Sequence, residues 1–407
     1  MGYYSDIETA PRNELRQLQG QRLARSVRRA YENVPFYRDR FDEAGVAPDD
    51  IQSIDDIQQL PFTTKEDFMD EYPTGLFATE LSAVCRIHAS SGTTGKPKIV
   101  GYTDSDLAVW KEVMARSLAA AGVEAGDTVQ NAYGYGLFTG GLGFHDGIER
   151  VGATVIPTGG GNTARQISML QDLESDALAC TPSYCLYLAE QAEERGVDVR
   201  DLPLSTVIIG AEPFTDPMRD EIEAALDVSA IDVYGLSEII GPGVSIECAE
   251  VQHGLHVWED HFYPEVIDPE TGEKLPPGQE GELVLTTLTK EALPAIRYRT
   301  GDITTLNEEP CDCGRTARRM DNIAGRTDDL IILRGVNVYP SQIEAAMVEI
   351  GDVAPHYRID LRREDSLDRM ELTVEHHEAY EGTTVVGPGV IDRSETGKVQ
   401  RVFDHRD

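Results

Sequence analysis

The chain has 407 residues, 40% of them hydrophobic, and a formal net charge of −36 from acidic residues spread over expected helix faces, as in halophilic proteins. This length buries a sizeable core and fits two or three domains, while the acidic surface disfavours nucleic acid and anionic membranes as partners. No apolar run reaches membrane-spanning length and the first residues lack a secretory hydrophobic region, so we expect a cytoplasmic protein.

The first 80 residues are expected to be largely helical. Apolar residues recur at helical spacing across 15–34, and Thr63 or Thr64 is positioned to cap a short helix. A longer helix follows, with Thr103 as its start signal and Gly122 as its stop signal. This region therefore precedes or covers the part of the chain that is rich in strands.

Short apolar runs alternate with helical patterns from about residue 150. The runs at 153–161, 204–213 and 229–238 are each predicted to be buried strands that end in loops marked by glycine or proline. Ligands of open α/β sheets bind at such carboxyl ends of strands. The segment 262–288 is predicted to be a β-hairpin with a long turn, and a small domain is expected at the C-terminus. The fold class is therefore α/β.

The segment Ser90–Lys98, SSGTTGKPK, has the composition of a phosphate-binding loop. Its glycines allow backbone N–H groups to approach an anion, and hydroxyl and ammonium groups supply further donors. It is not a Walker A loop, because only two residues separate Gly92 from Gly95 and because Pro97 follows Lys96. P-loop phosphoryl transfer is therefore disfavoured, and a polar turn without function is the alternative for this segment taken alone.

Five motifs occur in the order found in acyl-adenylate-forming enzymes: SSGTTGKPK, YGLSE, YRTGD, GRTDD and RSETGKVQR. Within that superfamily, the segments VPFYRDRF, LPFTTKEDF, WEDHFYPEVIDPETG and LIILRGVNVYPSQIE resemble phenylacetate–CoA ligase. The resemblance runs from about Tyr31 to the C-terminus. It implies a large multi-layer α/β adenylation domain, residues 1–325 with a helical start at 1–80, and a small mobile α+β lid domain, residues 326–407.

The resemblance also implies which residues bind ATP. Hydroxyl groups and Lys96 of the loop would donate to the β- and γ-phosphates, and Tyr234 would stack on the adenine. Asp302 would accept hydrogen bonds from the ribose hydroxyls, and Arg326 would contact ribose or phosphate. The nucleotide-binding set is Ser90, Ser91, Gly92, Thr93, Thr94, Gly95, Lys96, Gly210, Ala211, Glu212, Pro213, Tyr234, Gly235, Asp302 and Arg326.

Two further residues are implied to take part in catalysis. Glu238 offers a hard oxygen ligand for Mg²⁺. Lys398 matches the family's catalytic lysine, whose ammonium would stabilise charge between the substrate carboxylate and the α-phosphate; a solvated surface lysine is the alternative. The lid would turn about Asp328, so that one site serves both acyl-adenylate formation and transfer of the acyl group to coenzyme A.

The glycine-rich segment NAYGYGLFTGGLGFHDG matches the family's substrate-facing loop. Its rings Tyr133, Tyr135 and Phe138 suit an aryl group through stacked or edge-to-face packing, with core packing as the alternative for any single ring. The expected partner is therefore a small-molecule carboxylic acid, either phenylacetate or a similar aryl acid. A homodimer is considered as well.

Some of the six cysteines have a metal-like setting, and a disulfide framework is not expected in a cytoplasmic chain. Cys311 and Cys313 stand one residue apart in a turn, and the segment ECAEVQHGLH supplies Cys248 with His253 or His256. We predict a tetrahedral structural Zn²⁺ site with His253 as the fourth ligand. Free cysteines in a turn are the alternative.

The C-terminal segment 373–394 departs from the family pattern, because it contains no amphipathic helix between its β-rich stretches. Such a shortening would affect how the lid delivers Lys398. Two rival functions therefore stand beside the ligase. One is an adenylyltransferase of the same architecture that leaves AMP on its substrate, and the other is a non-catalytic nucleotide-binding protein.

Overall fold

The computed structural model describes residues 2–90, 97–327, 329, 331–333, 336–340, 342–343, 347, 353–364, 367–376, 385–386 and 402–405. Among the features expected from the sequence, the loop residues 91–96, the hinge Asp328 and Lys398 lie outside these described residues, as does most of the segment 373–394. No helix in the described ranges is long and apolar enough to cross a membrane.

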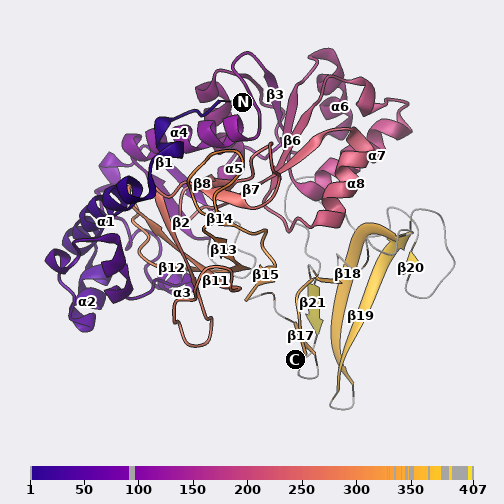
Figure 1. Cartoon of the computed structure of the whole chain (residues 1–407). Coiled ribbons are helices and arrows are strands. Elements are labelled where there is room, and N and C mark those ends of the chain that lie inside the picture. Colours follow the sequence, from indigo (N-terminus) through magenta and orange to yellow (C-terminus); the bar gives the residue numbers. More distant parts are fainter. Residues whose placement is uncertain are drawn as a thin grey trace.

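The N-terminal region is helical, as predicted, and lies along one side of the large domain (Figure 1). Thr64 caps a helix by accepting from the Asp67 N–H, while Pro35 opens another helix and left-handed Gly45 ends it. The elements are η1 Asp6–Thr9, α1 Arg12–Asn33, α2 Pro35–Ala44, η2 Pro48–Asp50, η3 Ile54–Gln59, α3 Lys65–Asp70 and η4 Leu81–Ala83. Buried side chains of α1 and α2 join the main hydrophobic core.

A nine-stranded sheet forms the centre of the molecule, in the order β13-β14-β9-β8-β7-β6-β5-β3-β4. Its strands are β3 Thr128–Asn131, β4 Thr154–Ile156, β5 Ala177–Cys180, β6 Thr206–Gly210, β7 Ser229–Leu236, β8 Gly241–Ile246, β9 Leu255–Val257, β13 Leu306–Asn307 and β14 Arg319–Met320. The half from β4 to β7 is parallel, and the half from β7 to β13 is antiparallel. The strands predicted at 153–161, 204–213 and 229–238 are thereby confirmed as β4, β6 and β7.

Helices cover this sheet and position the loops between its strands. They are α4 Asp104–Ala120, α5 Thr139–Val151, α6 Thr163–Asp172, α7 Pro182–Glu194, η5 Val199–Asp201 and α8 Asp216–Leu226. The predicted helix between Thr103 and Gly122 is confirmed as α4, since Thr103 accepts from the Asp106 N–H at its start. Helices α4 and α5 pack on each other and on β8, while α7 packs on α8. The hairpin of β1 Arg86–Ala89 and β2 Ile99–Tyr102 precedes α4.

A second sheet adjoins the first and contains the predicted hairpin. Its order is β10-β11-β12-β15, with strands β10 Phe262–Ile267, β11 Gly281–Thr287, β12 Tyr298–Thr304 and β15 Gly325–Arg326. Strands β10 and β11 pair antiparallel, which confirms the hairpin predicted at 262–288. The antiparallel pair of β12 and β15 places Asp302 opposite Arg326, so two motifs that are distant in sequence become neighbours.

The described C-terminal residues form two small sheets with their own apolar cluster. One contains β16 Ile331–Leu333 and β17 Val336–Val338; the other contains β18 Val353–Glu364, β19 Leu367–His376, β20 Val385–Val386 and β21 Val402–His405. Strands β18 and β19 make a long antiparallel hairpin that stands apart from the nine-stranded sheet (Figure 1). Ile359 and Leu361 of β18 are buried against partly buried residues of β19.

Candidate active site

The β1–β2 hairpin joins both ends of the phosphate-binding segment. Ser90 N–H donates to the Lys98 carbonyl oxygen at 3.0 Å, and Ser90 Oγ accepts from the Lys98 N–H at 3.2 Å. Ala89 lies opposite Ile99 in the strand register. The intervening residues Ser91–Lys96 lie outside the described part of the chain, but the two flanks that carry them are fixed to each other.

Glu238 is the buried carboxylate of this site. It follows β7, its side chain is 6% exposed, and Oε1 accepts hydrogen bonds from the Lys98 ammonium and, at 3.1 Å, from the Tyr298 hydroxyl. Burial opposes ionisation, but the charge and hydrogen bond of Lys98 outweigh burial and lower the pKa of Glu238. The side chain is therefore a carboxylate, the form that binds a divalent cation.

Two lysines beside Glu238 were missed by the sequence analysis as site residues. The Lys98 ammonium also lies 3.4 Å from the Tyr298 hydroxyl oxygen. Lys290 donates to the backbone carbonyl of Glu238 at 3.2 Å and lies 4.8 Å from the centre of the Tyr102 ring, and burial lowers its pKa to about 8. Lys98 could have been found, because it ends the phosphate-loop motif; Lys290 carries no comparable local signal.

Tyr234, Asp302 and Arg326 meet, as their predicted roles around one nucleotide require. The Tyr234 hydroxyl donates to Asp302 Oδ2 at 2.6 Å, and Arg326 forms an ion pair with Oδ1 of the same carboxylate. Burial and the Asp302 charge raise the pKa of Tyr234 well above its ordinary value, so this hydroxyl stays a donor. Gly235 approaches the next strand so closely that a Cβ would lie 2.0 Å from a carbonyl oxygen. Three of the predicted nucleotide-binding residues therefore form one cluster.

The segment Gly210–Pro213 leaves the end of β6 beside β7. Gly210 lies opposite Val233, and a Cβ there would lie 2.2 Å from the Val233 carbonyl oxygen, so only glycine fits. Ala211 is exposed and has φ of 70°, in the left-handed region. Glu212 Oε1 is buried and has no hydrogen-bond partner among the described residues. The predicted adenine segment thus lies one strand away from the strand that carries Tyr234.

The three rings predicted for the acyl pocket have different surroundings. Tyr133 is 5% exposed, donates from its hydroxyl to the Cys180 carbonyl at 2.6 Å, and stacks on Phe144 with 4.9 Å between ring centres. Tyr135 and Phe138 are each 37% exposed. Tyr133 therefore belongs to the packed core, and Tyr135 and Phe138 are the two rings that are open to a ligand.

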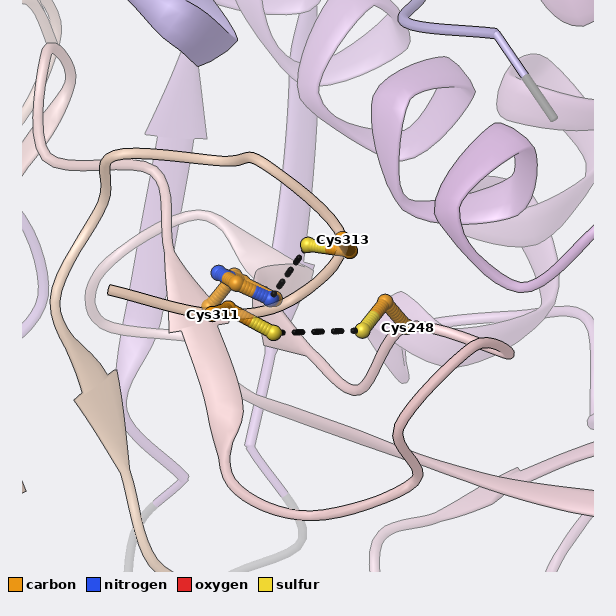
Figure 2. Close-up of side chains that lie close together, drawn as sticks. Cys248, Cys311 and Cys313 are labelled. Carbon is orange, nitrogen blue, oxygen red and sulfur yellow. Dashed lines mark hydrogen bonds between the residues drawn. The ribbon is translucent and has the colours of Figure 1, made fainter. Parts of the chain in front are cut away.

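Four potential metal ligands gather at the antiparallel side of the large sheet (Figure 2). Cys248 follows β8, His256 belongs to β9, and Cys311 and Cys313 lie in the turn between β13 and β14. The ligand atoms all lie within 4.8 Å of one another. The predicted fourth ligand, His253, is corrected to His256: β9 pairs with β14 and buries His256, whereas His253 is exposed in the preceding turn.

Comparison with known proteins agrees with this arrangement. Residues 36–288 match the family described as AMP-binding enzyme, and residues 335–384 match the AMP-binding enzyme C-terminal domain. The fold and the clustered side chains thus define the class as an AMP-binding, adenylate-forming enzyme.

Similarity to individual proteins is more specific. The chain is 50% identical to a phenylacetate-coenzyme A ligase of Thermus thermophilus, with all of both chains covered. It is 49% identical to the Escherichia coli protein of the same name, with 98% of this chain and 97% of the relative covered. The chain belongs to the phenylacetate–CoA ligase family.

Solved structures of a 2-hydroxyisobutyryl-CoA ligase have the same fold. Its postadenylation state with a bound acyl-adenylate matches with a TM-score of 0.91 at 29% identity, covering 98% of this chain and 91% of that chain. Its thioesterification state with coenzyme A matches with a TM-score of 0.78 at 30% identity, covering 98% and 92%. The arrangement seen in this chain is therefore closer to the first of those two states.

Proposed function

We propose that this chain is an ATP-dependent, AMP-forming acid–CoA ligase that activates phenylacetate or a similar aryl carboxylic acid. The observation that carries the proposal is its end-to-end likeness to phenylacetate-coenzyme A ligases at about half identical residues. The paired clusters of Glu238 with Lys98 and of Asp302 with Tyr234 and Arg326 support it, because they supply a carboxylate for a cation and hydrogen-bond acceptors for a ribose.

In the first step, a carboxylate oxygen of the acid forms a bond to the α-phosphorus of ATP. The bond from that phosphorus to the bridging oxygen of pyrophosphate breaks, which yields acyl-AMP and pyrophosphate. Lys98 and the loop that it closes face the phosphates, while Asp302 holds the ribose and Tyr135 and Phe138 contact the aryl ring. Glu238 would hold a bound Mg²⁺ ion, which would supply positive charge to the triphosphate.

In the second step, the thiolate sulfur of coenzyme A attacks the acyl carbonyl carbon. The bond from that carbon to the AMP oxygen breaks, and acyl-CoA and AMP leave. Lys398 is proposed to act in the first step and the lid, residues 326–407, to turn about Asp328 before the second. This turn would let one site serve both steps, because Lys398 would act in the first step and be replaced by another face of the lid in the second.

The lid of this chain is proposed to be shorter than that of its relatives. The alignment with the Thermus thermophilus protein spans 444 positions against 407 residues here, so 37 positions have no residue of this chain. A second alignment, with a Pseudomonas putida phenylacetate-coenzyme A ligase, has 369 positions over 91% of this chain and 83% of the relative, so the extra length of that relative lies outside the aligned part. These values support a shorter chain, and we assign the missing length to the lid because the segment 373–394 contains no amphipathic helix.

The remaining partners follow from the same proposal. A net charge of −36 disfavours nucleic acid and membrane as partners and suits a halophilic enzyme, which leaves the small-molecule acid as the partner. A cytoplasmic location, and action as a monomer or a homodimer, belong to the same proposal. Zinc has no part in the two steps, since a site with four protein ligands leaves no open position for a substrate.

A pyrophosphate-release assay at high salt over aryl and aliphatic acids, with and without coenzyme A, tests the function. The ligase predicts pyrophosphate release that needs an aryl acid, and AMP release that needs coenzyme A as well. AMP that stays on the acid in the presence of coenzyme A would indicate the adenylyltransferase. ATP binding without acid-dependent pyrophosphate release would indicate the non-catalytic nucleotide-binding protein.

A further inference from the structure

The Cys248, His256, Cys311 and Cys313 side chains have the spacing of ligands around one tetrahedral ion. Cys248 Sγ and Cys311 Sγ lie 3.8 Å apart, and Cys313 Sγ lies 3.4 Å from His256 Nε2. Zinc–sulfur bonds of about 2.3 Å at tetrahedral angles place two sulfur atoms about 3.8 Å apart, and a sulfur and a nitrogen about 3.5 Å apart. The sulfur–sulfur and sulfur–nitrogen separations therefore match a Cys₃His site.

The burial of the cluster points to a ligand as well. Cys248, His256 and Cys311 are 1%, 0% and 6% exposed. The Nδ1 atom of His256 has no hydrogen-bond partner among the described residues, whereas Nε2 of the same buried ring contacts Cys313 Sγ. A disulfide is not formed, since 3.8 Å is far longer than the S–S bond of about 2.05 Å. Three thiols and an imidazole in one buried space fit a soft, divalent cation.

The turn that carries Cys311 and Cys313 also binds the N-terminal segment Tyr3–Arg12. Tyr3 donates from its hydroxyl to the Cys313 carbonyl at 3.0 Å. The buried Arg315 guanidinium pairs with Glu8 at 2.8 Å, and Thr316 donates from its hydroxyl to the Ala10 carbonyl at 2.7 Å. The turn is thus attached on one side to the thiol cluster and on the other side to the first residues of the chain.

The turn has little regular structure to hold it in place. It lies between β13 and β14, which contain two residues each, and Gly314 in its middle has φ of 85°. A Cβ at Gly314 would lie 2.3 Å from the Tyr3 hydroxyl oxygen, so the contact with Tyr3 depends on this conformation. A cation bound by this turn, by His256 of β9 and by Cys248 would link the turn to the interior of the large sheet.

We propose that Cys248, His256, Cys311 and Cys313 bind one structural Zn²⁺ ion, and that this ion holds the N-terminal segment Tyr3–Arg12 on the sheet. The four protein ligands complete the tetrahedron, so the site stabilises structure and takes no substrate. The ion binds the folded turn and thereby stabilises it by mass action. When the ion is removed, the turn that carries Cys311 and Cys313 is free to move.

Metal analysis of the reduced, full-length protein tests the ligand set. Wild type and the matched control His253→Ala should each hold about one zinc per chain, whereas His256→Ala and Cys313→Ser should lose nearly all of it. Replacement by Co²⁺ should give the ultraviolet thiolate-to-metal band of a tetrahedral site in wild type and in His253→Ala, but not in His256→Ala or Cys313→Ser. Metal-free wild type after purification with zinc, a Cys248–Cys311 disulfide, or full zinc content in His256→Ala would overturn the site.

Hydrogen exchange on the wild-type protein tests whether the ion holds the segment Tyr3–Arg12 on the sheet. This experiment needs no variant that could misfold. Chelation of zinc should increase the exchange of the amides in Tyr3–Arg12 by about tenfold or more, and added zinc should restore protection. The amides of β5 and β6 in the parallel half of the sheet serve as the internal control and should stay protected. Release of zinc with unchanged exchange in Tyr3–Arg12 would overturn the proposed hold on the N-terminus.

Discussion

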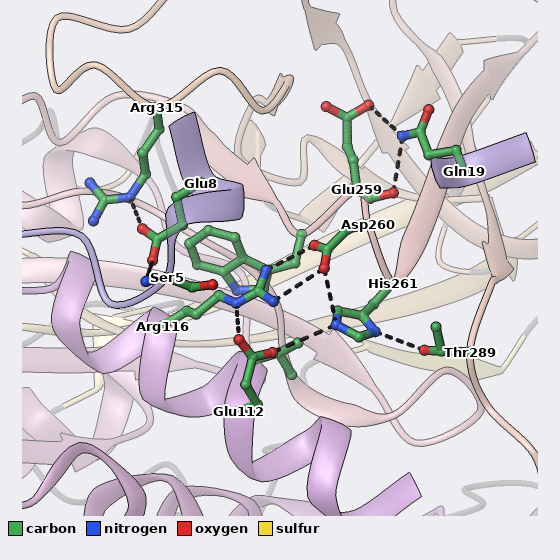
Figure 3. A network of polar contacts seen from close by, with 12 residues as sticks. Ser5, Glu8, Gln19, Glu112, Arg116, Glu259, Asp260, His261, Thr289 and Arg315 are labelled. Carbon is green, nitrogen blue, oxygen red and sulfur yellow. Dashed lines mark hydrogen bonds and ion pairs between the residues drawn. The ribbon is translucent and has the colours of Figure 1, made fainter. Parts of the chain in front are cut away.

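Two groups of buried carboxylates in this molecule differ in what neutralises them. Around Asp260, Arg116 and Glu112 of α4 join the adjacent His261 and Thr289 in one network (Figure 3). Around Glu259, the counter-charges are Arg12 of α1 and Arg318 of the segment before β14. The Arg116 and Arg318 side chains are 4% and 7% exposed, and Arg12, at 38%, adds a second guanidinium to Glu259 beside the buried Arg318. Around Asp302, the counter-charge is Arg326, whose side chain is 33% exposed.

The difference teaches where a ligand can enter. Asp260 receives two hydrogen bonds from Arg116, at 2.8 and 3.1 Å, and one contact from His261 at 3.1 Å, so nothing outside the protein is needed. Asp302 and Glu238 face cations that belong to short strands or loop ends, which a nucleotide with its own cation can displace. The first group therefore stabilises the fold, and the second can exchange partners.

The largest effect is expected from Asp302→Ala. A site built to bind hydroxyl groups discriminates by about 10⁴- to 10⁵-fold when those hydrogen bonds cannot form, so kcat/KM for ATP should fall by up to that factor. Pyrophosphate release at varied ATP measures it, with urea denaturation as a check on folding. Unchanged ATP kinetics in a folded variant would show that Asp302 serves only Arg326 and Tyr234.

Glu259→Gln changes the first group of carboxylates, so we expect it to lower stability rather than activity. It leaves the Arg12 and Arg318 guanidinium groups facing a neutral amide, and breaking a buried ion pair costs about 3–5 kcal/mol in the free energy of unfolding. Urea denaturation measures the loss, while kcat per folded molecule should be retained. Asp55→Asn is the matched control: Asp55 pairs with Arg16 at the surface, 74% exposed, and should cost less than about 1 kcal/mol. Equal losses in both variants would contradict the distinction.

Acid should weaken the same network. Although burial opposes ionisation, Arg318 and Arg12 lower the pKa of Glu259 from 4.5 to about 2. A pKa that is lower in the folded state than in the unfolded state stabilises the protein fully above the unfolded-state pKa. This stability, about 3 kcal/mol in total, is lost as pH falls from about 4.5 toward 2. Unfolding free energies measured across this range should fall steeply in wild type and less in Glu259→Gln. Parallel slopes would assign acid sensitivity to other groups.

Sequence reasoning reached the fold and the motif residues, because both leave local signals. Strand β6 has a continuous apolar pattern, and Tyr234, Asp302 and Arg326 sit in ordered motifs. It failed where a position depends on pairing between distant strands. His256 rather than His253 is buried because β9 pairs with β14, some sixty residues later, and no local period records that. The Glu259–Arg318 pair has the same origin, since 59 residues separate its partners.

Lys98→Met should have an intermediate effect on activity. It removes the ammonium that contacts Glu238, while the backbone of residue 98 still closes the phosphate-binding segment onto Ser90. We expect kcat/KM for ATP to fall about 10²-fold, the usual effect of losing one electrostatic group at a reacting centre. Lys111→Met is the matched control, because Lys111 pairs with Asp146 and is 40% exposed. A loss of the same size in both variants would point to a general effect of charge rather than to contact with the phosphates.

The smallest effect is expected from Glu221→Gln. Glu221 lies in neither group, and no ion pair joins it to a cation among the described residues. Burial and the charge of Glu190, on the neighbouring helix α7, raise the pKa of Glu221 from 4.5 to about 7. A raised folded-state pKa makes the ionised form unfavourable, so wild type loses stability as pH rises from about 4.5 to 7.

The variant should be about 1 kcal/mol more stable than wild type near pH 8, after allowance for solvent screening, and equal to it near pH 4. Urea denaturation at both pH values in low salt measures this, and high salt should shrink the difference because it screens the repulsion between the two carboxylates. A stabilisation that is the same at both pH values would mean that the glutamine packs better, and would remove charge from the explanation.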